Sequence, residues 1–162
     1  MHDQQLLLYE EDHRSVQAVI RQLIRDADAM AIFVVDMNGQ LVAEAGEIRD
    51  IDTTSLASLC AGCVAATAGL ARLVGENDFP VHFHQGRHAS LHVTRVTPQM
   101  ILAVVFDDRS SLGLVRLRVR KAVGGLARIF ETVRKKAERP RAFGNSPFAD
   151  ITDEDIDNLF SN

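Results

Sequence analysis

Residues 100–106 read MILAVVF, a run of seven apolar side chains with no polar position. Side chains of a strand point alternately to its two faces, so a strand that is apolar throughout has to be covered on both sides. Helices packed against the two faces of a sheet provide such cover. The run therefore predicts a central strand in a domain of the α/β (α+β) class.

Hydrophobic periodicity supplies the other elements of such a domain. Apolar positions three and four residues apart predict helices, and short alternating or β-branched segments predict strands. The dipeptide Asn38-Gly39 separates two of the strands and predicts a β-hairpin with a type I′ turn. In chain order we expect helix 11–28, strands 31–36 and 40–45, helix 53–74, strands 79–84, 89–96 and 100–107, and helix 112–137.

Length and composition restrict the class of protein. A chain of 162 residues fits one domain, and a net charge of −4 argues against general nucleic-acid binding, which needs a basic face. We expect no membrane insertion, because no purely apolar run approaches about 18 residues. The acidic start does not resemble a secretory signal. With two cysteines there is no disulfide framework, so a reducing, cytoplasmic location is predicted.

The composition changes near residue 139. Residues 1–138 form the predicted domain, and residues 139–150, which include RPRAFGNSP, are predicted to be a flexible linker. Residues 151–162 begin with ITDEDIDNLF, a capped amphipathic pattern for a short helix. Such a short helix is marginal alone in water, so it needs either a groove on a partner or its own domain. Its apolar face consists of Ile156, Leu159 and Phe160.

Common catalytic signatures are missing from the sequence. It contains no GxxxxGK[ST] loop for nucleotide phosphates, no GxGxxG fingerprint and no GxSxG elbow. We therefore predict no catalytic residues, no cofactor and no enzymatic activity of the chain itself.

Cysteines and histidines offer two alternative interpretations. Cys60 and Cys63 form a CxxC pair, which is either a redox or metal-binding pair or two small residues packed on a helix. Four histidines either bind a metal incidentally or belong to a solvated strand face with some pH sensitivity. We favour packing and solvation, and predict no metal site. The histidines are His82, His84, His88 and His92.

Basic residues allow two further interpretations. Arg109 could act in trans as an arginine finger at a phosphoryl-transfer site, but Asp107 and Asp108 suggest local pairing instead. The last helix has a basic side that either meets anionic lipid or an acidic partner, or is a solvated face. Its basic residues are Arg116, Arg118, Arg120, Lys121, Arg128, Arg134, Lys135 and Lys136.

Small residues form a stripe on the central predicted helix, where residues 56–73 read LASLCAGCVAATAGLARL. Such a stripe allows close approach by another helix or sheet, or provides a flat platform for a partner. Larger apolar residues occupy other positions, and a helix that is apolar nearly all round usually has two buried faces. One face is expected on the domain's own sheet and the other in an oligomer. The stripe comprises Ala57, Ala61, Ala65, Ala68 and Gly69.

The order α-β-β-α-β-β-β-α with a small-residue central helix resembles the Roadblock/dynein light chain family. Several motifs extend the resemblance along the whole chain to the bacterial polarity regulators of that family. They are YEE at 9–11, VDMNGQL at 35–41, IDTTSLASL at 51–59, GENDFP at 75–80, FD at 106–107, SLGLVRLR at 111–118 and DIDNLF at 155–160.

This resemblance implies a central antiparallel five-stranded sheet flanked by helices, and a homodimer built through the central helix and an edge strand. It implies a regulator of a Ras-like small GTPase, with two copies of this chain to one GTPase. The regulator would stimulate GTP hydrolysis by reshaping the partner's switch regions, without an arginine finger. The C-terminal helix would influence nucleotide exchange, and the protein would control cell polarity and motility from a cell pole.

A Roadblock scaffold that recruits partners without changing GTP hydrolysis is the alternative function. The acidic C-terminal segment favours the regulator, because a bare scaffold does not need it. We assign GTPase binding to Ala61, Ala65, Ala68, Gly69, Ile156, Leu159 and Phe160, and the dimer interface to Leu56, Leu59, Leu70, Leu73 and Phe79.

Overall fold

A computed structural model describes residues 8–139 of the chain. Its element order confirms every helix and strand predicted for this part, with ends that differ by one or two residues. The elements are α1 (Glu10–Ala27), β1 (Ala31–Asp36), β2 (Leu41–Gly46), α2 (Thr53–Leu73), β3 (Val81–Gln85), β4 (Ser90–Thr97), β5 (Met100–Phe106) and α3 (Leu112–Glu138).

Five strands form one sheet in the order β2-β1-β5-β4-β3, and all neighbouring strands are antiparallel. The apolar run at residues 100–106 is β5, which lies in the middle of the sheet and is almost entirely buried. Strands β2 and β3 are the two edges. The predicted α+β class with a five-stranded antiparallel sheet is therefore confirmed.

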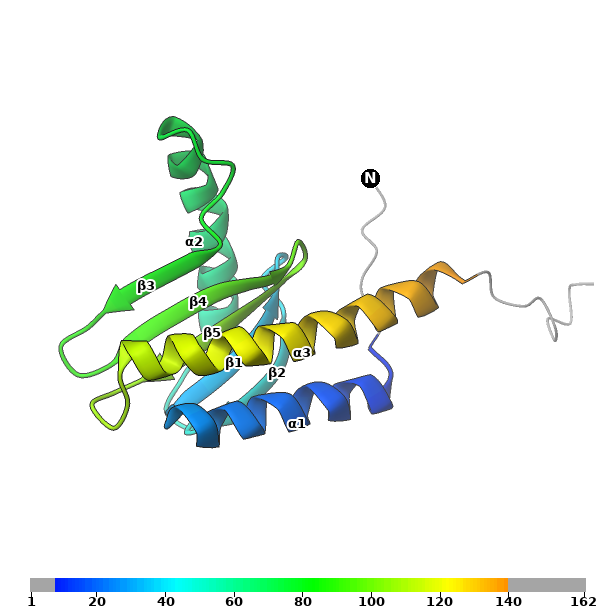
Figure 1. Cartoon of the computed structure of the whole chain (residues 1–162), viewed down its shortest axis with the longest axis horizontal. Coiled ribbons are helices and arrows are strands. Elements are labelled where there is room, and N and C mark those ends of the chain that lie inside the picture. The colour runs from blue at the N-terminus through cyan, green and yellow to red at the C-terminus, as the bar shows by residue number, and fades with distance from the viewer. Residues whose placement is uncertain (1–7, 140–162) are drawn as a thin grey trace, which may run out of the picture.

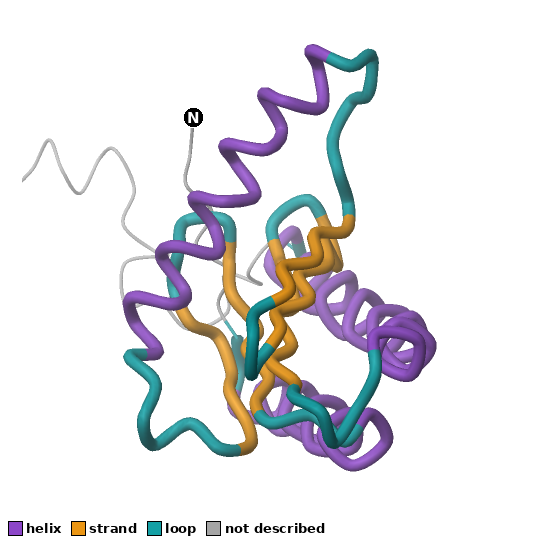
Figure 2. The backbone as a smooth tube through the Cα atoms, turned by 90° about the vertical axis from the view of Figure 1, so that its left-hand side faces the viewer, coloured by secondary structure: helices purple, strands orange, loops and turns teal. Residues whose placement is uncertain are grey.

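Helices cover both faces of this sheet, but unequally. Helices α1 and α3 lie side by side on one face (Figure 1). Helix α2 lies on the other face, and its C-terminal half rises beyond the strands (Figure 2). The larger hydrophobic cluster joins α1 and α3 to the sheet, and the smaller cluster joins α2 to the sheet. The α2 face is thus the less covered face of the domain.

Helix α3 follows the predicted pattern closely. Ser111 caps it by accepting a hydrogen bond from the Leu114 N–H at 3.2 Å. Apolar spacing in the sequence predicts a buried stripe that is buried at most of its positions but omits Phe130, which is buried, and includes Ile129, which is half-buried. The predicted stripe is Leu112, Val115, Val119, Ala122, Leu126, Ile129 and Val133. Ile129 and Phe130 are adjacent on the helix, so the buried stripe is rotated slightly from its predicted position.

Strands β1 and β2 form the predicted hairpin, but the predicted turn type was wrong. Gly39 alone of the dipeptide has a positive φ, at +85°, whereas a type I′ turn needs positive φ at both residues. The Gly39 N–H donates to the Asp36 carbonyl at 3.0 Å. The Asp36 carboxylate accepts from the N–H groups of Asn38 and Gln40. This side chain stabilises a longer loop that the dipeptide alone did not reveal.

Helix α2 bears on the prediction of no membrane insertion, which remains a prediction. By length and composition alone this helix could cross a membrane. Alanine and cysteine make the helix apolar without forming a run of large apolar residues. A mostly buried core helix of a soluble protein passes the same test, so one such helix is weak evidence of membrane insertion, although only 28% of this window is buried within the chain. The predicted C-terminal helix, residues 151–162, and residues 140–150 of the predicted linker lie outside the described residues.

Candidate protein interface

Helix α2 starts from a well-formed cap. The Asp52 carboxylate accepts hydrogen bonds from the Ser55 N–H at 3.1 Å and the Ser55 hydroxyl at 2.7 Å. These hydrogen bonds lower the pKa of Asp52 below its ordinary value. One side of the helix then packs on the sheet through Ala57, Cys60 and Val64. The cap and this packing hold the amino-terminal half of α2 in place.

Large apolar side chains on the rest of α2 face solvent. Leu59 is 73% exposed, Leu70 is 56% exposed and Leu73 is 83% exposed. These are three of the residues predicted at a dimer interface, whereas Leu56 is half-buried against the sheet. Val74, just after the helix, is exposed as well. Exposed apolar groups gathered on one element are typical of a protein–protein contact surface.

The predicted small-residue contact surface is divided by the fold. Ala65 is exposed, and Ala68 and Gly69 are half-buried. A Cβ added at Gly69 would meet no atom within 4 Å. Ala61, by contrast, is buried inside the domain. Ala65, Ala68 and Gly69 therefore remain available to a partner, and Ala61 does not in this conformation.

Strand β3 adds an open edge beside α2. It pairs with β4 on one side only, so its other side offers free backbone N–H and C=O groups to another strand. Val81 on this strand is 43% exposed, and Phe79 just before it is half-buried. Sequence reasoning named Phe79 but missed Val81, although the alternation along the strand marks it. We define the α2–β3 surface as Leu59, Ala65, Ala68, Gly69, Leu70, Leu73 and Val81.

Side chains of α2 and β3 also contact one another. The Thr67 hydroxyl lies 3.4 Å from the His82 ring nitrogens, and the Cys63 Sγ lies 3.8 Å from His84 Nε2. Burial lowers the pKa of His82 and, with the nearby Cys63, raises the pKa of Cys60. Within the described residues no group of three or more His, Cys, Asp or Glu side chains could hold a metal. The CxxC pair is divided between the buried Cys60 and the half-buried Cys63.

Arg109 pairs with Asp107 as predicted, but its second partner is Glu47, 62 residues away in the sequence, and not the predicted Asp108. Its guanidinium lies 3.0 Å from the Asp107 carboxylate and 2.8 Å from the Glu47 carboxylate. These pairs raise the pKa of Arg109 and lower those of Asp107 and Glu47. An arginine finger would have to leave both partners, so the structure favours local pairing over that role.

The basic residues of α3 are exposed, as a solvated helix face requires, and Arg134 pairs with Glu131 and Glu138.

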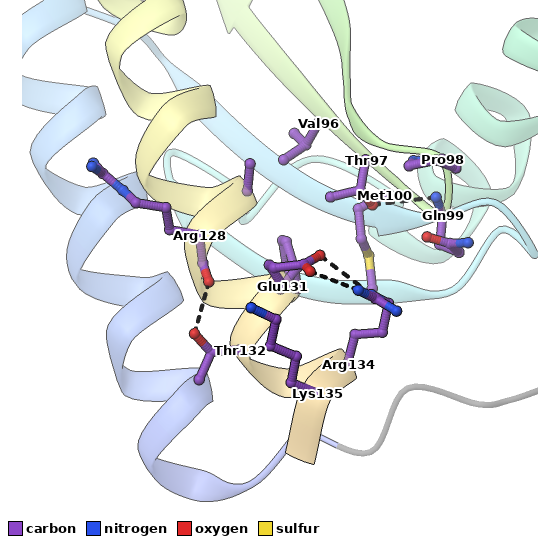
Figure 3. Close-up of a pocket in the computed structure, with 12 residues that line it drawn as sticks. Val96, Thr97, Pro98, Gln99, Met100, Arg128, Glu131, Thr132, Arg134 and Lys135 are labelled. Carbon is purple, nitrogen blue, oxygen red and sulfur yellow. Dashed lines mark hydrogen bonds and ion pairs between the residues drawn. The ribbon is translucent and has the colours of Figure 1, made fainter. Parts of the chain in front are cut away.

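A cavity of about 830 Å³ lies between the C-terminal half of α3 and the β4–β5 turn. Figure 3 shows Glu131 and Arg134 on its helix side and Thr97, Gln99 and Met100 on its strand side. Sequence reasoning did not find this cavity, because it depends on how the turn is placed over the helix.

Comparison with known proteins adds to this geometry. The Roadblock/LC7 domain matches residues 15–106, which include most of α1, all of α2 and all five strands. The chain belongs to the Roadblock/LC7 family. No curated protein matches it. The residues that match the family therefore include both elements of the α2–β3 surface.

Solved structures of family members agree with this placement. The chain is similar to Myxococcus xanthus MglB at 53% sequence identity, with a TM-score of 0.74 over 78% of this chain and 96% of that chain. It is similar to the gliding protein MglB of Thermus thermophilus at 31% identity, with a TM-score of 0.76 over 81% and 99%. A structure described as MglB with tetrameric arrangement is 30% identical, with a TM-score of 0.77 over 82% and 99%.

Proposed function

We propose that this chain is a homodimeric regulator of a Ras-like small GTPase of the MglA type. Two copies of the chain bind one GTPase and stimulate GTP hydrolysis without an active site of their own. The observation that carries the proposal is the exposed α2–β3 surface in a chain whose fold and sequence match MglB structures. Apolar side chains of this size are better covered than left in water, at about 25 cal/mol per Å².

The two parts of the surface serve two contacts. The exposed leucines of α2 and the free edge of β3 bring two copies together, with the sheets continuing across the dimer. Ala65, Ala68 and Gly69 then form a shallow platform for the GTPase, because small side chains permit close approach. Each subunit contributes one platform, so the dimer presents two platforms to a GTPase that binds across the dimer axis.

Stimulation without an arginine finger follows from what the platform lacks. Arg109 is held by two carboxylates, away from α2 in the sequence, and the platform itself carries no catalytic side chain. The regulator therefore acts by stabilising one arrangement of the partner's switch regions, in which the GTPase aligns its own catalytic groups.

The C-terminal helix is proposed as a second contact. Ile156, Leu159 and Phe160 lie outside the described residues, so this role rests on the sequence pattern alone. We propose that they dock on the GTPase away from its active site and change nucleotide exchange. Removal of residues 148–162 should leave dimerisation intact but alter nucleotide release at low salt more than at high salt. Equal release rates with both proteins at both salt concentrations would contradict this role.

The cellular role follows from the same proposal. The regulator controls cell polarity and gliding motility from the cytoplasm, with enrichment at a cell pole. Support comes from the likeness to MglB proteins, of which the one from Thermus thermophilus is named a gliding protein.

GTP turnover by a cognate GTPase, measured with and without this chain, tests the proposal and its alternative. Stimulation supports the regulator, and unchanged turnover despite binding supports a recruiting scaffold. Ala65→Arg combined with Gly69→Arg should abolish stimulation. Gly124→Arg is a matched control, because Gly124 is also a helical glycine with no atom within 4 Å of an added Cβ, but it lies on α3. Full stimulation by a folded platform variant would exclude the platform as the contact.

A further inference from the structure

A cavity of about 380 Å³ lies on the face of the sheet opposite α2. It opens between β3, β4 and the amino-terminal half of α3, which lies against β4 (Figure 1). The GTPase platform does not include it, and Val81 on the edge strand β3 is the one residue that it shares with the α2–β3 surface. Its lining residues are Val81, His92, Thr94, Arg116, Val119, Arg120 and Val123.

His92 and Thr94 are the buried polar residues among those that line this cavity. His92 is 2% exposed, and its Nδ1 lies 3.2 Å from the Thr94 hydroxyl. Within the described part of the chain its Nε2 has no hydrogen-bond partner. Buried polar atoms nearly always have a partner, so this nitrogen indicates that something in the cavity bonds to it. When the Thr94 hydroxyl donates to Nδ1, Nε2 carries the proton and becomes a donor into the cavity.

Two arginines supply positive charge to the same space. Arg116 and Arg120 lie four residues apart on α3, where like charges repel each other. Among residues 8–139 neither forms an ion pair, whereas Arg109 and Arg134 each have two carboxylate partners. Arg116 is near enough to His92 to contribute, after burial, to lowering its pKa. The cavity therefore combines two unpaired cations with an unpaired donor.

We propose that this cavity binds the phosphate group of a small anionic ligand. The guanidinium groups of Arg116 and Arg120 donate to the phosphate oxygens, and His92 Nε2–H supplies a third donor. Thr94 holds the imidazole ring in the required orientation. The valine side chains of the cavity form an apolar wall beside the phosphate, where the remainder of an organic ester fits. The charge of the two arginines matches that of a phosphate dianion.

Nuclear magnetic resonance of the histidine rings tests the proposal on the full chain. Inorganic phosphate is titrated at constant ionic strength against chloride, and the ring protons of His92 are followed, with the exposed His13 as internal reference. We expect a saturable shift at His92 and a higher His92 pKa in phosphate, because the bound anion opposes the charge of Arg116. A parallel titration with glycerol 3-phosphate asks whether the ester adds affinity or the phosphate group alone is recognised. Absence of a saturable His92 shift with both probes would overturn the proposal.

Charge-removing variants provide the second arm of the test. Arg116→Gln and Arg120→Gln should each weaken phosphate affinity about tenfold or more, the value expected for a lost charged hydrogen bond. Arg118→Gln is the matched control, because Arg118 is exposed on the same helix but lines a different cavity, between α1 and α3. If the phosphate affinities of the Arg116→Gln and Arg120→Gln variants equalled that of the Arg118→Gln control, phosphate would not bind at this cavity. That result would also overturn the proposal.

Discussion

Helices α2 and α3 cover opposite faces of one sheet but bury their apolar residues differently. Helix α3 buries one stripe and presents charged residues elsewhere, as a helix on the surface of a monomer does. Helix α2 buries a shorter side and leaves Leu59, Leu70 and Leu73 in solvent. The difference teaches that the apolar content of α2 exceeds what packing within one chain explains, and the proposed dimer accounts for the excess.

The largest expected effect is on the α3 face. Leu126 is fully buried there, and Leu126→Ala should lower the free energy of unfolding by about 2–5 kcal/mol, because it leaves a cavity in the core. Urea denaturation measures this change. Leu117→Ala is the control on the same helix, since Leu117 is exposed, and it should change stability by less than about 0.5 kcal/mol. Similar losses in both variants would contradict the stripe assigned to α3.

A charge placed on the exposed side of α2 should act on assembly instead. Leu59→Asp combined with Leu73→Asp should convert a dimer to a monomer, because each leucine loses about 1.5–3 kcal/mol of burial in the interface. Sedimentation equilibrium at micromolar concentration measures the dissociation constant, which should rise at least about a hundredfold. Leu117→Asp on α3 serves as the control. A dimer that survives the double substitution would place the interface elsewhere.

The contact between α2 and the β1–β2 turn can be tested with two glycines. Gly39 and Gly75 both have φ of +85°, but a Cβ at Gly39 would lie 3.0 Å from the Ser58 Cα on α2, and one at Gly75 would meet nothing within 4 Å. Gly75→Ala should cost about 1 kcal/mol of backbone strain, and Gly39→Ala should cost more, up to about 3 kcal/mol. Urea midpoints provide the comparison. Equal costs would mean that α2 does not press on the turn.

The smallest effect concerns buried histidines on the two faces. Burial lowers the pKa of His82 on the α2 face and of His92 on the α3 face, where Arg116 contributes as well. The unfolded chain therefore takes up protons first as pH falls below about 6.5, and stability is lost on acidification. Urea midpoints at pH 7.5 and 5.5 should differ less in His92→Gln than in the exposed control His88→Gln. Identical differences would show that His92 does not contribute to the pH dependence.

Much of the fold was predictable because it depends on local patterns. The periodicity of α1 and α3 and the apolar run of β5 specify elements and faces directly. The turn after β1 was mispredicted because the Asp36 carboxylate, outside the dipeptide, determines its shape. The other differences from prediction concern which residues of α2 and α3 are buried, and these depend on how each helix packs on the sheet.

The candidate interface was predictable in composition but not in exposure. The sequence identified the leucines of α2, yet it could not show that Ala61 faces inward while Ala65 faces outward. His92 and the two arginines near it belong to different elements. Their convergence on one cavity required the packing of α3 on β4.

Hydrogen–deuterium exchange of the full chain, with and without an MglA-type GTPase bound to GTP, tests the central claim most directly. The account predicts slower exchange in α2, especially in its C-terminal half, on addition of the GTPase, while α1 and α3 exchange at unchanged rates. Slower exchange confined to α1 and α3, with α2 unaffected, would contradict the claim that the exposed side of α2 is the partner surface.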